Sequence, residues 1–310
     1  YLLVYMMLLI NARYSTFRHI VKTSFIMTVF SVLFVVLCCK AGIVEDLVYS
    51  RNGVENAHSY GFGHYSSISY FALYLTIMWL YLRQTVIGYL EIAAIIAFNL
   101  GIYYATTTRL GFYIAILVII MYIVLIKFDF INTASKLFMF FASIGFYTTF
   151  IVCLIINYFY DSTNPTLLMI DKLLNNRLEM GNTALKLYNP KLFGQMIEMV
   201  GIKTAVFGTG NNTYFYIDSG YIYALLGYGI IFTLIILTLY TMVMRNTAKN
   251  KQYVLLIWSI AVMLFTVSNN AWVSITYNPL LFYVVISEKN NLLKQFFAVR
   301  KNKFKLKIKI

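Results

Sequence analysis

Three arginines and one aspartate are the residues of this chain whose types best suit chemistry on a charged substrate. Arg51, Arg109 and Arg177 carry permanently charged guanidinium groups, whose planar fork of N–H donors matches the oxygens of a phosphate. Asp218 lies at the entrance of an apolar run, where partial loss of water would raise its pKa towards the range of a useful general base. An aspartate at this position also suits the N-cap of a helix, and the sequence leaves both roles open.

The arginines differ in how strongly their positions argue for a site. Arg51 also suits a solvated loop. Arg109 follows three threonines at the start of an apolar run, so its charge must snorkel or face the interior of a helix bundle. Arg177 lies between two amphipathic stretches. His64, in a Gly-Phe-Gly-His segment, is the second acid–base candidate, and Asn212 ends the polar segment Gly-Thr-Gly-Asn-Asn.

Several familiar motifs are missing from the sequence. It has no Asp-x-Asp pair, no GxxxxGK[ST] phosphate loop, no HExxH and no Cys/His set with the spacing of metal ligands. Cys38, Cys39 and Cys153 all lie in apolar runs, where a free cysteine behaves as a small hydrophobic residue. We therefore expect no disulfide, no bound metal and no cofactor.

The elements that position these residues are long apolar runs. The chain is 61% hydrophobic and 12% charged, with a mean hydropathy of +0.74, which is typical of an integral membrane protein. A membrane-spanning helix needs about 20 apolar residues. Nine candidate spans satisfy this approximately: 1–10, 23–39, 67–82, 86–105, 110–126, 137–159, 218–244, 252–268 and 271–287. We expect an all-α, polytopic helix bundle in which residues 1–310 form one membrane domain. Because the sequence opens at Tyr1 inside an apolar run, we also expect an N-terminally truncated polypeptide.

Charged residues divide unequally between the two sides of these spans. One side has 17 basic and 3 acidic residues, and the other has 8 of each, which gives net charges of +14 and 0. The positive-inside rule assigns the first side to the cytoplasm, together with the basic tail at 288–310. Attraction to anionic membrane lipids explains this excess without a nucleic-acid partner.

Two large loops are left on the outer side, at 40–66 and 161–217. Within the longer one, apolar residues recur at helical spacing over 167–174 and again over 192–206. Both stretches are predicted to form amphipathic helices in the membrane interface or over the bundle. A loop of this length in a compact protein is typically functional.

The order of features around the longer outer loop resembles that of the Wzy-type polysaccharide polymerases and, more distantly, of the O-antigen ligases. The resemblance rests on Arg177, the Gly208-Thr209-Gly210 segment, the Asp218-Ser219-Gly220-Tyr221 segment and the Leu/Gly-rich run from Leu225 to Ile231. Upstream, the segments that end in His64 and in Arg109 resemble motifs of the Gram-positive polymerases. Ligases commonly have His-Asn where this chain has Asp-Ser, which favours a polymerase.

The resemblance implies a GT-C-like fold and glycosyl transfer at the outer face of a bacterial cytoplasmic membrane. The substrate would be an undecaprenyl-diphosphate-linked oligosaccharide, and partners would include membrane lipids, a flippase and a chain-length regulator. Asp218 would act as base, with Arg109 and Arg177 on the diphosphate, and with His64, Arg51 and Asn212 binding substrate.

Three alternatives remain open at this point. A ligase would use the same chemistry, a flippase or transporter would move the same lipid-linked sugars, and a structural membrane protein would have no site. Ion-coupled transporters usually carry ionisable residues near the membrane midplane, and the predicted spans have few.

Overall fold

The computed structural model describes residues 7, 11–12, 14–51, 54–127, 136–201, 204–205, 214–274, 277–284 and 286. Asn212, the Gly208–Gly210 segment, the basic tail at 288–310 and almost all of the predicted first span lie outside these residues.

The described chain is mostly helical. Its helices are α2 (Phe17–Lys40), α3 (Ser66–Arg83), α4 (Tyr89–Thr106), α5 (Arg109–Tyr122), α6 (Lys136–Tyr158), α7 (Pro165–Leu173), α8 (Arg177–Leu187), α10 (Gly220–Tyr223), α11 (Ile230–Lys249) and α12 (Tyr253–Thr266). Four helical stretches are long and apolar enough to cross a membrane: Phe17–Lys40, Tyr89–Thr106, Arg109–Ile126 and Ile230–Lys249. These four indicate a membrane protein, and the full set of nine predicted spans is not confirmed.

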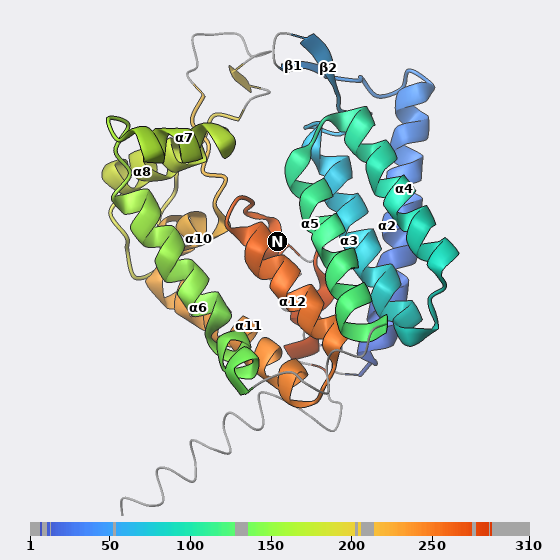
Figure 1. Cartoon of the computed structure of the whole chain (residues 1–310). Helices are drawn as coiled ribbons and strands as arrows, with labels where there is room; N and C mark the ends of the chain where they lie inside the picture. The colour runs from blue at the N-terminus through green and yellow to red at the C-terminus, as the bar shows by residue number, and fades with distance from the viewer. Residues whose placement is uncertain are drawn as a thin grey trace, which may run out of the picture.

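The helices form two groups joined by α12 (Figure 1). In the first group, α2, α4 and α5 all pack against α3, most of whose residues are buried. In the second, α6 packs against α8, α10 and α11. Helix α12 contacts α3 and α5 on one side and α6 and α11 on the other. On the outer surface of α2, large apolar side chains such as Ile26, Phe30 and Phe34 are more than half exposed. Such a surface suits contact with lipid rather than with water.

The last predicted span, 271–287, is wrong for the residues described. Its chain forms two separate 3₁₀ helices, Ala271–Val273 and Pro279–Val284. Between them Asn278 is fully buried; its Oδ1 accepts from Trp258 Nε1 at 3.2 Å and its Nδ2 donates to Tyr240 OH at 2.7 Å. Pro279 disfavours a helical conformation for the residue before it, which separates the two 3₁₀ helices. The bonds of Asn278 to Tyr240 of α11 and Trp258 of α12 hold this segment in the core.

The predicted span at 218–244 is divided at Gly229. A π-helical turn at Ala224–Tyr228 precedes Gly229, whose φ of +93° ends the turn, and α11 begins at Ile230. The first N–H groups of a helix have no partner within the helix. Here Ile230 and Ile231 donate theirs to the carbonyls of Lys191 and Leu192, at 3.0 and 3.2 Å.

This pairing also explains why the amphipathic helix predicted at 192–206 is wrong over 192–201, where the described chain is not helical. The backbone near Leu192 is not helical and lies beside the start of α11, and Gly194 approaches the preceding π-helical turn so closely that a Cβ there would lie 2.2 Å from Gly227 O. The helix lies earlier instead, as α8. The other amphipathic prediction, 167–174, agrees with α7, which begins at Pro165 after an Asn164 N-cap.

An antiparallel hairpin in the 40–66 loop was not predicted. Strands β1 (Val48–Arg51) and β2 (Val54–His58) are fixed at their base by Asp46. Its carboxylate lies 2.8 Å from His58 Nδ1 and accepts from the Tyr60 N–H at 2.7 Å. Burial raises the pKa of Asp46, but these bonds outweigh it and hold the pKa below its usual value. The hairpin lies at the same end of the molecule as α7 and α8 (Figure 1), so both predicted outer loops share one end.

Candidate functional site

An ion pair between Arg177 and Asp218 forms the centre of the candidate site. Arg177 Nε lies 3.0 Å from Asp218 Oδ2, and the two side chains are only 19% and 28% exposed. Arg177 is the first residue of α8, and Asp218 precedes α10, so residues 41 positions apart meet here. The sequence singled out both residues, and the structure brings them together.

Asp218 is available for this pairing because its neighbour caps α10. Ser219 is the N-cap residue of that helix, and its Oγ accepts from the Ile222 N–H at 3.5 Å. The capping role that the sequence left open for Asp218 is therefore filled by Ser219. Burial raises the pKa of Asp218 above its ordinary value, although the adjacent Arg177 charge opposes that shift. A carboxylate with a raised pKa is a better proton acceptor near neutral pH.

Asp171, which sequence reasoning missed, sets the position of Arg177. It is 1% exposed; its Oδ1 accepts from the N–H groups of Leu178 and Glu179, at 2.8 and 3.4 Å, and its Oδ2 accepts from Tyr160 OH at 2.9 Å. Asp171 thus caps the first turn of α8 from α7 and fixes the direction in which that helix starts.

A tight turn between α7 and α8 makes this cap possible. Asn175 and Asn176 both have positive φ, at +57° and +60°, and the Asn176 N–H donates to the Asp171 carbonyl at 2.9 Å. Asparagine enters the left-handed region more easily than most residues. The Asn-Asn pair just before Arg177 was therefore the available sequence signal for this turn.

The ion pair lies in the wall of a polar cavity of about 630 Å³. The cavity adjoins the N-terminal end of α3, the α7–α8 turn and the segment after α12. Its lining is rich in tyrosines, carboxamides and hydroxyls, with His64 among them: Ser50, Ser66, Ser67, Tyr65, Tyr70, Tyr214, Tyr216, Tyr277, Asn175, Asn269 and Asn270. Such groups offer many hydrogen bonds and several flat apolar faces, a combination that suits a carbohydrate.

His64 is anchored at this cavity through one of its ring nitrogens. Its Nδ1 accepts from the Ser66 N–H at 3.2 Å and lies 2.6 Å from Ser66 Oγ. A neutral imidazole that accepts at Nδ1 carries its proton at Nε2. The ring lies against Tyr65, with centroids 4.2 Å apart, and close to Tyr49, at 5.6 Å. The contacts with Ser66, Tyr65 and Tyr49 therefore fix the position of the His64 ring at the cavity.

Two tyrosines of the cavity lining, Tyr214 and Tyr216, keep their protons. Burial raises the pKa of Tyr214, and the Asp218 charge raises it further. Burial likewise raises the pKa of Tyr216, whose hydroxyl accepts from Asn270 Nδ2 at 3.1 Å. Both hydroxyls therefore stay neutral donors, able to bind a sugar or a phosphate oxygen.

The other predicted site residues lie elsewhere or cannot be placed. Arg109 begins α5, is exposed and is not among the described residues that line the cavity. Arg51 ends β1, next to Ser50 of the lining, but only its backbone is described. Asn212 lies outside the described residues. Arg109, Arg51 and Asn212 therefore stay predictions.

Neither a metal cluster nor a known relative guides the assignment further. Within the described part of the chain, no group of three or more His, Cys, Asp or Glu side chains is arranged to hold a metal ion. Comparison of the sequence and the structure with protein-family models, curated proteins and solved structures found no match. The geometry of the site and the sequence features around it are therefore the observations that bear on its function.

Proposed function

We propose that this protein is a membrane glycosyltransferase that polymerises undecaprenyl-diphosphate-linked oligosaccharide repeat units at the outer face of a bacterial cytoplasmic membrane. The observation that supports it best is the Arg177–Asp218 pair in the wall of a tyrosine- and amide-rich cavity. The proposal includes a GT-C-like arrangement of membrane-spanning helices, a cytoplasmic C-terminus, and a flippase and a chain-length regulator as partners.

In the proposed reaction, a hydroxyl of one lipid-linked unit attacks the anomeric carbon of the growing chain. Asp218 accepts the proton of that hydroxyl as the new C–O bond forms. The bond between the anomeric carbon and the diphosphate oxygen breaks, and its electron pair leaves with the diphosphate. The sugar passes through an oxocarbenium-like state, as in glycoside hydrolysis. Arg177 stabilises the departing negative charge through its remaining N–H groups.

The ion pair also explains how binding of the donor could activate the base before the reaction. Without substrate, Arg177 lowers the pKa of Asp218 against the effect of burial. A bound diphosphate would compete for the same guanidinium, and its own charge would make Asp218 more basic. The base therefore becomes stronger when the donor is in place. His64 and the tyrosine hydroxyls would contact the sugar of the acceptor.

The position of the cavity favours an enzyme over a transporter. Its described lining comes from the end of the bundle that carries the hairpin, α7 and α8. A transporter for lipid-linked sugars would instead need a cavity that opens alternately to both faces. A ligase remains the closest alternative, because it would use the same residues for the same bond exchange.

The test is the pattern of lipid-linked intermediates in cells that carry Arg177→Ala or Asp218→Ala. A polymerase defect leaves single repeat units accumulating at normal protein level, whereas a ligase defect leaves long lipid-linked chains. Lys186→Ala, on the same helix α8 and exposed, is the matched control and should keep polymer length. Unchanged polymer length in both site variants would refute the assignment.

A further inference from the structure

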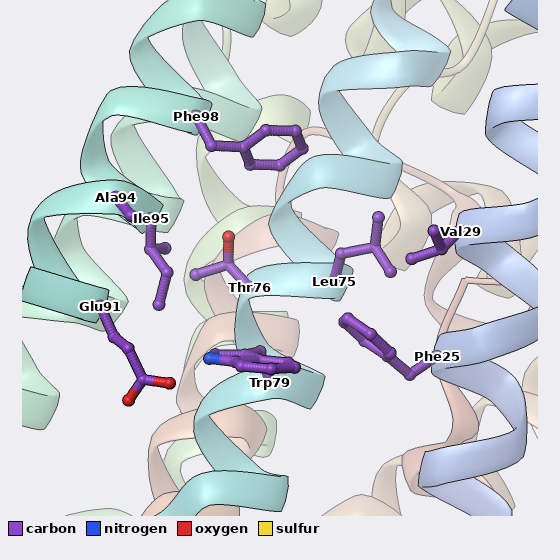
Figure 2. A pocket seen from close by; sticks show the side chains of 9 residues that line it. All are labelled: Phe25, Val29, Leu75, Thr76, Trp79, Glu91, Ala94, Ile95 and Phe98. Carbon is purple, nitrogen blue, oxygen red and sulfur yellow. The ribbon is translucent and has the colours of Figure 1, made fainter. Parts of the chain in front are cut away.

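An apolar groove of about 350 Å³ lies away from the candidate site, between α2 and α4 and over α3. Figure 2 shows its lining: Phe25 and Val29 from α2, Leu75, Thr76 and Trp79 from α3, and Glu91, Ala94, Ile95 and Phe98 from α4. The Phe25 and Trp79 rings are in contact, with centroids 5.4 Å apart. The groove follows the half of α3 that ends at Arg83, whereas the cavity adjoins the other end of that helix.

Thr76 and Glu91 of this lining already have partners in the protein. Thr76 Oγ1 accepts from Asn99 Nδ2 at 2.8 Å, and both residues are buried. Glu91 Oε1 lies 3.0 Å from Arg83 Nε. With the side chains of Thr76 and Glu91 engaged in this way, the groove gives ordered water little to bind. Its remaining surface is hydrocarbon and aromatic, and it suits an alkyl chain.

One end of the groove is basic. Arg18 Nη2 donates to Leu82 O at 2.8 Å, which places the start of α2 beside the end of α3. Lys22 precedes Phe25 by three residues, so the two lie on one face of α2. Arg83 follows Trp79 by one turn, with its guanidinium 5.9 Å from the Trp79 ring.

The charges at this end do not cancel. The carboxylate of Glu91 neutralises Arg83 through their ion pair, but Arg18 and Lys22 are exposed and add two further positive charges. A guanidinium has five N–H donors, and the bond from Arg18 to Leu82 uses one. This is also the end that the charge distribution assigns to the cytoplasm, where the membrane surface is rich in anionic lipid.

We propose that the groove and its basic end form a binding site for one anionic phospholipid. One acyl chain lies along Phe25, Trp79 and Phe98, and the headgroup phosphate is held by Arg18 and Lys22. Trp79, between chain and headgroup, occupies the depth at which tryptophan is enriched in membrane proteins. The site requires nothing of the proposed glycosyl transfer.

Quenching of Trp79 fluorescence by brominated lipid tests this site directly. The chain has three tryptophans, and Trp258 and Trp272 are fully buried, so Trp79→Phe gives the background. The full chain is placed in vesicles of phosphatidylcholine, with brominated phosphatidylglycerol or brominated phosphatidylcholine added at equal fractions. We expect stronger quenching by the phosphatidylglycerol, and a preference that falls roughly fivefold for each of Arg18→Ala and Lys22→Ala.

Two matched controls separate the groove from the general lipid surface. Ala94→Phe fills the groove and should abolish the enhanced quenching, whereas Ala93→Phe adds the same bulk on an exposed neighbour outside the lining and should preserve it. Lys40→Ala removes a charge at the opposite end of α2 and should leave the lipid preference intact.

Three results would overturn the proposal. Equal quenching by the two lipids would remove the headgroup site. Identical behaviour of the Ala94 and Ala93 variants would remove the groove as the chain-binding surface. Absence of quenching by either lipid would show that protein, such as a second copy of the chain, covers Trp79.

Discussion

Exchanging Asp218 for Asn and Arg177 for Gln, singly and together, separates a catalytic role of this pair from a structural one. Breaking a fully buried ion pair costs about 3–5 kcal/mol, and breaking an exposed pair costs about 0–1 kcal/mol. At 19% and 28% exposure and an N–O distance of 3.0 Å, we expect about 1–3 kcal/mol for either single exchange. When only Arg177 is replaced, Asp218 can take up a proton and become neutral, which limits the loss of stability.

The double exchange is the informative variant. It leaves no unpaired charge, so it should recover most of the stability that either single exchange loses. Activity should not recover: loss of a general base costs about 100- to 10,000-fold, and a missing cation on the leaving group has an effect of similar size.

Both quantities are measurable on the same samples. Thermal unfolding of the purified protein in detergent gives stability, and polymer length on a gel, at matched protein level, gives activity. If the double variant regained polymer formation together with its melting temperature, the pair would be structural and the catalytic reasoning would be refuted.

Three further predictions concern the elements that support the site. Asp171→Asn puts an N–H donor among three donors and should cost about 2–3 kcal/mol, seen as a lower melting temperature with reduced polymer length; an unchanged melting temperature would contradict the capping role. Gly194→Ala places a Cβ 2.2 Å from a backbone oxygen at a φ of +82° and should lower the melting temperature by several degrees, whereas Gly101→Ala, with open space around it, should not. Because the pKa of Asp46 is lowered in the folded state, its stabilisation is present above the ordinary pKa of an aspartate and is lost as the pH falls through the folded value. Melting temperatures of wild type and Asp46→Asn should therefore differ at neutral pH and converge as the pH falls below the ordinary pKa of an aspartate; a constant difference would exclude the ionised Asp46 carboxylate as the source of the stabilisation.

The long helices were predictable because their signal is local. Runs of 14 to 24 mostly apolar residues, as in α2 and α12, identify helices by length and composition alone. Helix α7 was predictable for the same reason, since Asn164 and Pro165 mark its start and apolar spacing marks its body.

The errors occurred where distant segments compete for the same backbone groups. The stretch after Leu192 has helical spacing, yet Lys191 and Leu192 give their carbonyls to the first N–H groups of α11. Periodicity within one segment carries no information about such a partner 39 residues away. In the same way, nothing local to Asn278 shows that Trp258 and Tyr240 will bond both ends of its side chain.

The candidate site could be predicted only in part from the sequence. Residue type and position singled out Arg177 and Asp218 separately, but their pairing depends on Asp171, on the left-handed Asn175–Asn176 turn and on Ser219 as the cap of α10. The charge count predicted zero net charge on the outer side, and the structure shows how several of its carboxylates are engaged: Asp46 with His58, Asp171 with helix N–H groups and Asp218 with Arg177. The first two carboxylates bond to groups that fix the fold. Of these three, only Asp218 has its partner charge in the wall of a large polar cavity, so burial beside that cavity, rather than charge itself, distinguishes the candidate catalytic pair.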